Sequence, residues 1–294
     1  MLIAAAVVPG PPALVPELMG SAAHELDDLR GAADRAVSLA LTDLLAAQTD
    51  SPPVSGAALG SLSSSLSGAS SNTPSNTPSN TSSNTLSGSV SPSVQLFVVG
   101  AGRPGELNAA GPVSFDSFGR GVVIPALAEG SPGDPGLPTP IMVARYLASR
   151  DLEANPGHGD IWASARWITT GGDEASDLGA QLAAGSNPVA LILVADGAAC
   201  HGPKAPMAQD ARAKEYDDGV CAALASGQPD RMARLDADLG AELGASGPRV
   251  WPVLVAAAGG EMVGDVLWAG APYGVGWAVA SWRRPSAGGA LAQA

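Results

Sequence analysis

The chain has 294 residues, which is enough for one large domain or two small ones, and 46% of them are hydrophobic while only 4% are aromatic. Its core must therefore be built mainly from Ala, Val and Leu. A formal net charge of −13 and only 15 scattered Lys and Arg residues argue against nucleic-acid binding, because a phosphate backbone requires clustered positive charge.

The redox state and the location of the chain follow from what it contains few of. Cys200 and Cys221 are too few for a disulfide framework and are expected to be reduced thiols. The apolar run at the amino terminus is short for a signal peptide, and no stretch approaches the roughly 20 apolar residues of a membrane span. We therefore expect a cytoplasmic protein with no membrane association.

The first twenty residues contain the clearest strand signal. Residues 2–8 read LIAAAVV, an apolar run that stops at Pro9 and is typical of a strand buried on both faces. The loop that follows, Pro9-Gly10-Pro11-Pro12, should lie at the carboxyl end of this strand, where open α/β sheets bind ligands. Gly10, Pro11 and Pro12 are therefore candidate cleft residues.

A helix and then a stretch of low complexity follow. Leu, Ala and Val at spacings of three and four predict a helix over 22–47, with Ser21 as its N-cap. Residues 49–93 contain the repeat SNTPSNTPSNTSSNT and have almost no charge and little to bury. We predict that 49–93 is a disordered insertion within one domain.

The middle of the chain alternates short apolar runs with loops. A strand over 94–99 ends at Gly100, which makes Gly100 another cleft candidate. We expect His158 to lie in a surface loop, and a turn at Gly119 between two strand-like pieces. The predicted elements are strand pieces over 113–118 and 121–126, a helix over 139–149, and a strand over 161–169.

The last third begins with the most convincing strand, residues 189–195, which ends at Asp196-Gly197. Strands over 261–268 and 275–282 should pair across the turn that contains Tyr273. The predicted helices of this third are 173–184, 211–225, 230–235, 237–244 and 251–258. Residues 285–294 should form a flexible tail.

Alternating strands and helices predict the fold class. We expect a single α/β domain formed by 1–48 and 94–284, with helices on both faces of a central mostly parallel or mixed sheet. This arrangement is a three-layer sandwich.

Four segments in this order are similar to a known family. AAAVVPGPPALVPEL, IMVARYLA, DGAA and APYGVGWAVASW resemble the class III extradiol ring-cleavage dioxygenase family. The resemblance implies a ferrous iron held by two His and one carboxylate, with the first His between the first two prolines. Here that residue is Gly10. No His lies between His24 and His158, so the family's second ligand is also missing.

Two functions follow from this resemblance. The first is a dioxygenase-like protein that has lost its iron and is non-catalytic or altered; we assign no metal ligands and no cofactor to it. The alternative is an active oxidoreductase that uses Fe(II) and O2 to cleave a catechol-type diol through relocated ligands. A small aromatic ligand is expected in both, and a homo-oligomer or a partner subunit is left open.

Three residues are candidates for chemistry at the strand ends. His201 follows the 189–195 strand and is the best candidate for acid–base work, the alternative being a solvent-facing loop residue. Asp196 either orients a ligand or holds its loop through an Asx turn with Gly197. Tyr273 either presents its hydroxyl to the cleft or packs on Trp277, and we favour packing.

Overall fold

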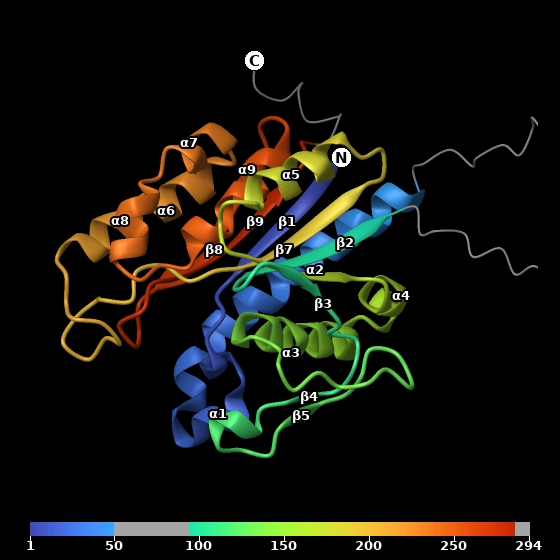
Figure 1. The fold of residues 1–294 in the computed structure, drawn as a ribbon, viewed down its shortest axis with the longest axis horizontal. Coiled ribbons are helices and arrows are strands. Elements are labelled where there is room, and N and C mark those ends of the chain that lie inside the picture. Colours follow the sequence, from blue (N-terminus) through green and yellow to red (C-terminus); the bar gives the residue numbers. More distant parts are fainter. Residues whose placement is uncertain (50–93, 286–294) are drawn as a thin grey trace, which may run out of the picture.

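The computed structural model describes residues 1–49 and 94–285, and these form a mixed sheet with helices on both faces (Figure 1). The strand order is β3-β6-β2-β7-β1-β9-β8. Four parallel strands form the centre, and antiparallel strands lie at both edges. The parallel strands are β1 (Leu2–Val8), β2 (Gln95–Ala101), β6 (Arg166–Thr170) and β7 (Val189–Val194). The antiparallel ones are β3 (Gly105–Leu107), β8 (Val263–Gly270) and β9 (Trp277–Arg283).

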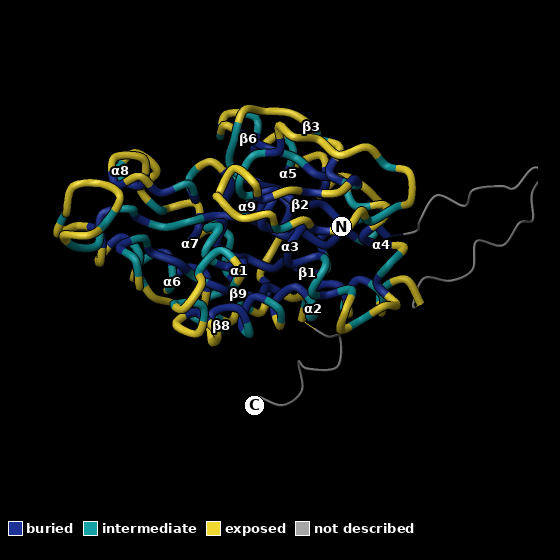
Figure 2. The backbone as a smooth tube through the Cα atoms, turned by 90° about the horizontal axis from the view of Figure 1, so that it is seen from below, coloured by how far each residue is buried: buried dark blue, intermediate teal, exposed yellow. Residues whose placement is uncertain are grey.

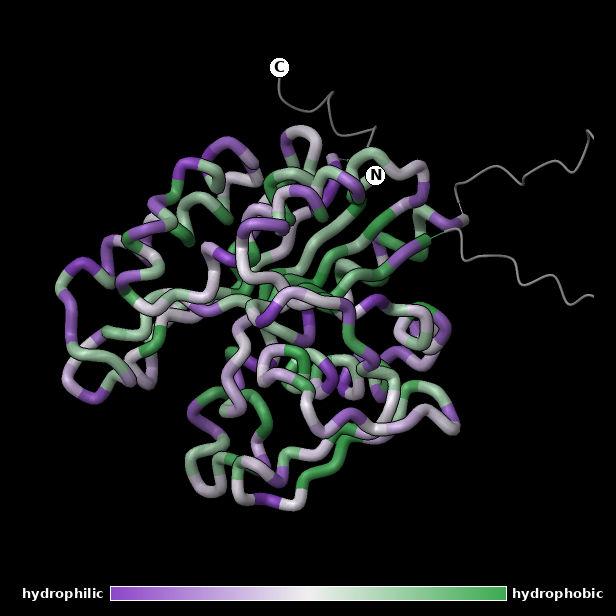
Figure 3. The backbone as a smooth tube through the Cα atoms, viewed as in Figure 1, coloured by the Kyte–Doolittle hydropathy of each residue, from purple (hydrophilic) through white to green (hydrophobic). Residues whose placement is uncertain are grey.

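Both faces of the sheet are covered, as the apolar run LIAAAVV predicts. Ala4, Ala6 and Val8 of β1 join the core beneath α2 (Asp27–Thr49) and α3 (Thr139–Ala154). Ala5 and Val7 join the core on the other face. That face is covered by α5 (Ala175–Ala184), α6 (Arg212–Ser226) and α9 (Trp251–Ala258). The central strands are accordingly buried and hydrophobic (Figures 2 and 3). The three-layer α/β prediction is confirmed.

Most predicted elements are present within a few residues of their expected bounds. The closing hairpin β8–β9 pairs from Val263↔Arg283 to Gly270↔Trp277. The predicted helix over 251–258 is α9. The shorter helices are α1 (Pro16–Met19), α4 (Gly159–Ala163), α7 (Pro229–Ala233) and α8 (Ala237–Glu242).

The predicted strand over 161–169 is wrong in its first half. Residues 159–163 form α4, and β6 begins only at Arg166. Trp162 gives the reason, because its indole Nε1 donates a hydrogen bond to Asp151 Oδ2 at 2.8 Å and fixes this turn against α3. His158, expected in a surface loop, is 6% exposed and its Nδ1 lies 2.7 Å from the same Asp151 oxygen.

The helix predicted over 22–47 begins later than Ser21. Residues Gly20–Leu26 form a 3-10 helix, and α2 starts at Asp27. The buried Arg30 explains this shift, because its guanidinium donates to the carbonyl oxygens of Leu14 at 2.8 Å and Ala13 at 3.0 Å and ties the loop after β1 to α2.

The strand pieces over 113–118 and 121–126 shrink to a small ribbon. β4 (Val113–Ser114) pairs antiparallel with β5 (Val123–Ile124), and Gly119 provides the expected turn with a φ of +81°. Residues 116–118 form a 3-10 helix instead of a strand, since the Phe118 N–H donates back to the Phe115 carbonyl.

Two further predictions bear on the ends of the described residues. The insertion at 49–93 and the tail at 285–294 lie outside them, apart from Thr49, the last residue of α2, and Pro285. Among the helices that the structure describes, none is both long enough and apolar enough to cross a membrane.

Candidate functional site

The carboxyl ends of β1, β2 and β7 meet at one edge of the sheet, because the three strands run parallel. The loop after β7 is bound there to the turn before β9. Gly197 N–H donates to the Gly276 carbonyl at 2.7 Å, and Gly276 N–H donates to the Ala198 carbonyl at 2.8 Å. His201 N–H donates to the Gly274 carbonyl at 3.0 Å. The loops carrying the predicted cleft residues therefore share this edge.

The space around Gly10 is filled. A Cβ added to Gly10 would lie 3.0 Å from Val194 Cγ1 and 3.5 Å from Pro140 Cα. Gly100 has the same neighbour, since its Cβ would lie 3.1 Å from Pro140 Cβ. Pro140 in the first turn of α3 thus covers both glycines, and Gly10 itself is buried. Pro11 and Pro12 are only partly exposed beside it. No room for an imidazole exists at Gly10.

Asp196 holds the loop after β1. Its Oδ1 accepts a hydrogen bond from Gly10 N–H at 3.0 Å, while its carbonyl accepts from Ser246 N–H and Gly247 N–H. The Asx turn considered from the sequence is not formed, because Gly197 N–H points instead to Gly276. Burial raises the pKa of Asp196 to about 6, against the opposing effect of the Gly10 hydrogen bond.

His201 is paired with Asp217 of α6. His201 Nε2 and Asp217 Oδ2 are 2.6 Å apart, and each side chain is only 16% exposed. Ala198 N–H also donates to the Asp217 carboxylate, at 3.0 Å to Oδ1. Burial raises the pKa of Asp217, although both hydrogen bonds act to lower it. The solvent-facing alternative for His201 is therefore wrong.

A cavity of about 320 Å³ opens beside this pair. Its wall includes His201, Asp217, Cys221 and Trp277, and an exposed ion pair of Lys214 with Asp218 at 2.6 Å lies at its rim. A void of about 20 Å³, enough for one water, adjoins it and is lined by Trp251 and Trp277 among others. The Nε1 atoms of both tryptophans are buried and have no partner among the described residues.

Cys221 is not prepared for nucleophilic attack in this cavity. Burial raises the pKa of its thiol, and the charges of Asp217 and Asp218 raise it further. The thiol therefore stays protonated near neutral pH.

Sequence reasoning missed three members of this wall: Asp217, Cys221 and Trp277. Asp217 resembles any acidic residue near the start of a helix, where it favours the helix dipole. The available signal was the spacing of Asp217 and Cys221, which are four residues apart and so share one face of α6.

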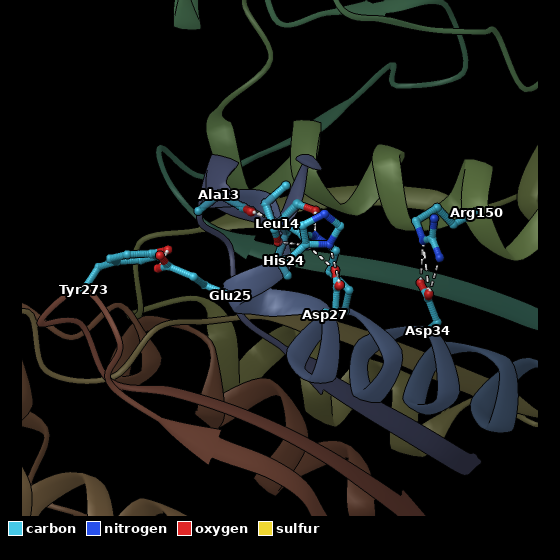
Figure 4. A network of polar contacts seen from close by, with 10 residues as sticks. Ala13, Leu14, His24, Glu25, Asp27, Asp34, Arg150 and Tyr273 are labelled. Atoms are coloured by element: carbon cyan, nitrogen blue, oxygen red, sulfur yellow. Dashed lines mark hydrogen bonds and ion pairs between the residues drawn. The ribbon is translucent and has the colours of Figure 1, made fainter. Parts of the chain in front are cut away.

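Tyr273 lies outside this cavity wall and connects two distant segments. Its ring contacts the edge of Trp277 with centroids 6.0 Å apart, so the expected packing is present. Its hydroxyl also donates to Glu25 Oε2 at 2.7 Å (Figure 4). Tyr273 thereby joins the turn before β9 to the 3-10 helix that precedes α2.

The side chains do not fit the iron centre that the family resemblance implies. All three histidines of the chain are described, and each pairs with a different aspartate: His24 with Asp27, His158 with Asp151 and His201 with Asp217. Within residues 1–49 and 94–285, no group of three or more His, Cys, Asp or Glu is arranged to hold a metal ion.

No family model matches this chain, and no curated protein sequence matches it. The resemblance to extradiol dioxygenases accordingly rests on the four sequence segments quoted above.

Proposed function

We propose that this chain is an extradiol dioxygenase-like protein without the iron centre, and that it binds a small aromatic ligand beside His201 and Asp217 rather than cleaving it. The observation that carries the proposal is the packing at Gly10. The position where the family has its first His ligand carries no side chain, and Val194 and Pro140 occupy the space that one would need.

The cavity beside His201 supports the choice of ligand. Its volume of about 320 Å³ is near the lower end for ligand sites and suits a compound with a single ring. Trp277 offers an aromatic wall, and aromatic pairs gain stability from offset or edge contact. His201 uses Nε2 for Asp217, and in the described part of the chain its Nδ1 has no partner, so this nitrogen is left for a ligand hydroxyl.

Binding of catechol to the purified protein tests this function. We expect titration calorimetry to detect catechol but not cyclohexane-1,2-diol, which has the two hydroxyls without the ring. The variant His201→Ala should lose binding, while Lys204→Ala, an exposed change in the same loop, should keep it.

A metal analysis decides between this proposal and the iron enzyme. After anaerobic loading with Fe(II) and desalting, we expect far less than one iron per chain and no oxygen uptake on addition of catechol. Stoichiometric iron with nitrogen ligands, together with catechol-dependent oxygen uptake, would contradict the proposal. Absence of catechol binding in the iron-free protein would contradict its ligand.

A further inference from the structure

Arg145 is a buried cation without a counter-charge. It lies in the middle of α3 and has 0% of its surface exposed. No carboxylate among the described residues pairs with it. Arg150, five residues along the same helix, shows the usual arrangement, since its Nε and Nη2 both donate to Asp34.

The hydrogen bonds of Arg145 use one end of the guanidinium only. Nη2 donates to the carbonyl oxygens of Pro125 at 2.6 Å and Gly111 at 3.2 Å. Nε and Nη1 are buried and have no partner within the described ranges. A guanidinium carries five N–H donors, so three of them remain unused.

This arrangement is costly unless something completes it. Burial alone lowers the pKa of Arg145 to about 10, which reflects the loss of water around the charge. The Trp167 ring, with its centroid 5.8 Å from the guanidinium carbon, compensates in part. Buried charges in proteins are normally paired and fully hydrogen-bonded.

A cavity of about 260 Å³ meets Arg145 between α3 and the segment after β5. Its wall is mostly apolar and is formed by Pro125, Ala126, Leu127 and Leu152, together with Ser149. Glu153 also borders it, but lies eight residues from Arg145, which is about 12 Å along the helix. One end of the cavity is therefore cationic and the other end is acidic and exposed.

We propose that this cavity binds a small organic carboxylate, with the apolar part of the ligand against Leu127 and Leu152 and its carboxylate on Arg145. Pro125 and Ala126 are exposed and cover the guanidinium, so this short segment shifts when the ligand enters. The cavity shares no residue with the one beside His201, so it is independent of the function proposed above.

Nuclear magnetic resonance of the Arg145 Nε–H in 15N-arginine-labelled full-length protein tests this site without any mutation. We expect benzoate at millimolar concentration to shift this signal, whereas benzamide, its uncharged analogue, leaves it unchanged. A guanidinium that only holds backbone carbonyls would respond to neither compound, and that result would overturn the proposal. An equal response to inorganic phosphate would overturn the role of the apolar wall.

Titration calorimetry with a matched pair of variants completes the test. Arg145→Met should weaken benzoate binding at least about tenfold, since the charge-assisted hydrogen bonds are lost. Arg150→Met, on the same helix but paired with Asp34, should leave benzoate affinity unchanged. Unchanged affinity in Arg145→Met would contradict the assignment, and if that variant does not fold, the resonance experiment still decides.

Discussion

The backbone N–H of Gly10 donates to Oδ1 of Asp196 at 3.0 Å and joins the loops that follow β1 and β7. These residues are 186 positions apart in the sequence. The bond places a half-buried carboxylate where the family resemblance implies a metal ligand. Asp196 therefore stabilises the strand-end loops, and its charge has a measurable effect on stability.

The change Asp196→Asn should raise stability near neutral pH. The pKa of Asp196 is about 6 in the folded protein against an ordinary value of 3.8. Between these values the folded chain holds more protons than the unfolded chain, so the free energy of unfolding falls as pH rises. Asn keeps the acceptor for Gly10 N–H without the charge. We expect a gain of about 1 kcal/mol at pH 7, because partial solvent contact reduces the roughly 3 kcal/mol of a two-unit shift.

Urea denaturation at several pH values checks this expectation. The stability difference between Asp196→Asn and the wild type should grow between about pH 4 and pH 6 and then level off, following the titration of one buried carboxyl. A difference that is constant across this range would contradict the raised pKa.

A side chain at Gly10 should destabilise the fold without creating an iron site. The Cβ of Gly10→His would lie 3.0 Å from Val194 Cγ1, and overpacking of this kind costs about 1–3 kcal/mol. Equilibrium unfolding measures the loss, and we expect no gain in Fe(II) binding. A matched test is Gly10→Ala combined with Val194→Ala, in which the smaller neighbour should recover part of the stability lost by Gly10→Ala alone. Tight Fe(II) binding by Gly10→His would contradict this account.

The layered fold was largely predictable because its strands are recorded in local patterns. The run Leu2–Val8 could be assigned to a strand buried on both faces, and the register of the closing hairpin follows from its turn. β3 was not predictable, because Gly105 and Glu106 are exposed and carry no apolar alternation. α4 was missed because its fixed point, the bond from Trp162 to Asp151, joins side chains eleven residues apart.

The candidate site was predictable only in part, for a similar reason. His201 and Asp196 follow an obvious strand, so their edge of the sheet could be inferred. The partner of His201 could not, because Asp217 comes from the next helix and its role depends on how α6 packs. Arg145 lies within the apolar segment IMVARYLA, and no local pattern reveals that its charge is buried without a carboxylate.

The two oxygens of Asp217 should be separable by mutation. Asp217→Ala removes the acceptor of Ala198 N–H as well as the partner of His201, and leaving these groups unpaired should cost about 1–3 kcal/mol. Asp217→Asn retains an acceptor for Ala198 N–H and should lose less stability. Chemical denaturation of both variants measures this order, and equal losses would contradict the Ala198 contact.

The hydrogen bond between Tyr273 and Glu25 should contribute little to global stability and more to local order. Both residues are at the surface, and Tyr273→Phe should cost no more than about 1 kcal/mol. Hydrogen exchange should nevertheless become faster in residues 20–26, because this bond ties that 3-10 helix to the turn before β9. Faster exchange spread over the whole chain, including the central strands, would contradict a local role.

Arg30 should be much more important for stability than its neighbour on the same helix. Its buried guanidinium donates to the carbonyl oxygens of Leu14 and Ala13 and also contacts Asp27. Arg30→Met leaves these carbonyls without donors, and at about 1 kcal/mol for each lost bond the expected destabilisation is about 2–3 kcal/mol. Arg35→Met, at an exposed position one and a half turns along α2, should change stability by less than about 0.5 kcal/mol. Thermal and urea unfolding of the two variants provide the comparison. Similar small effects for both would show that the loop after β1 is held by packing alone.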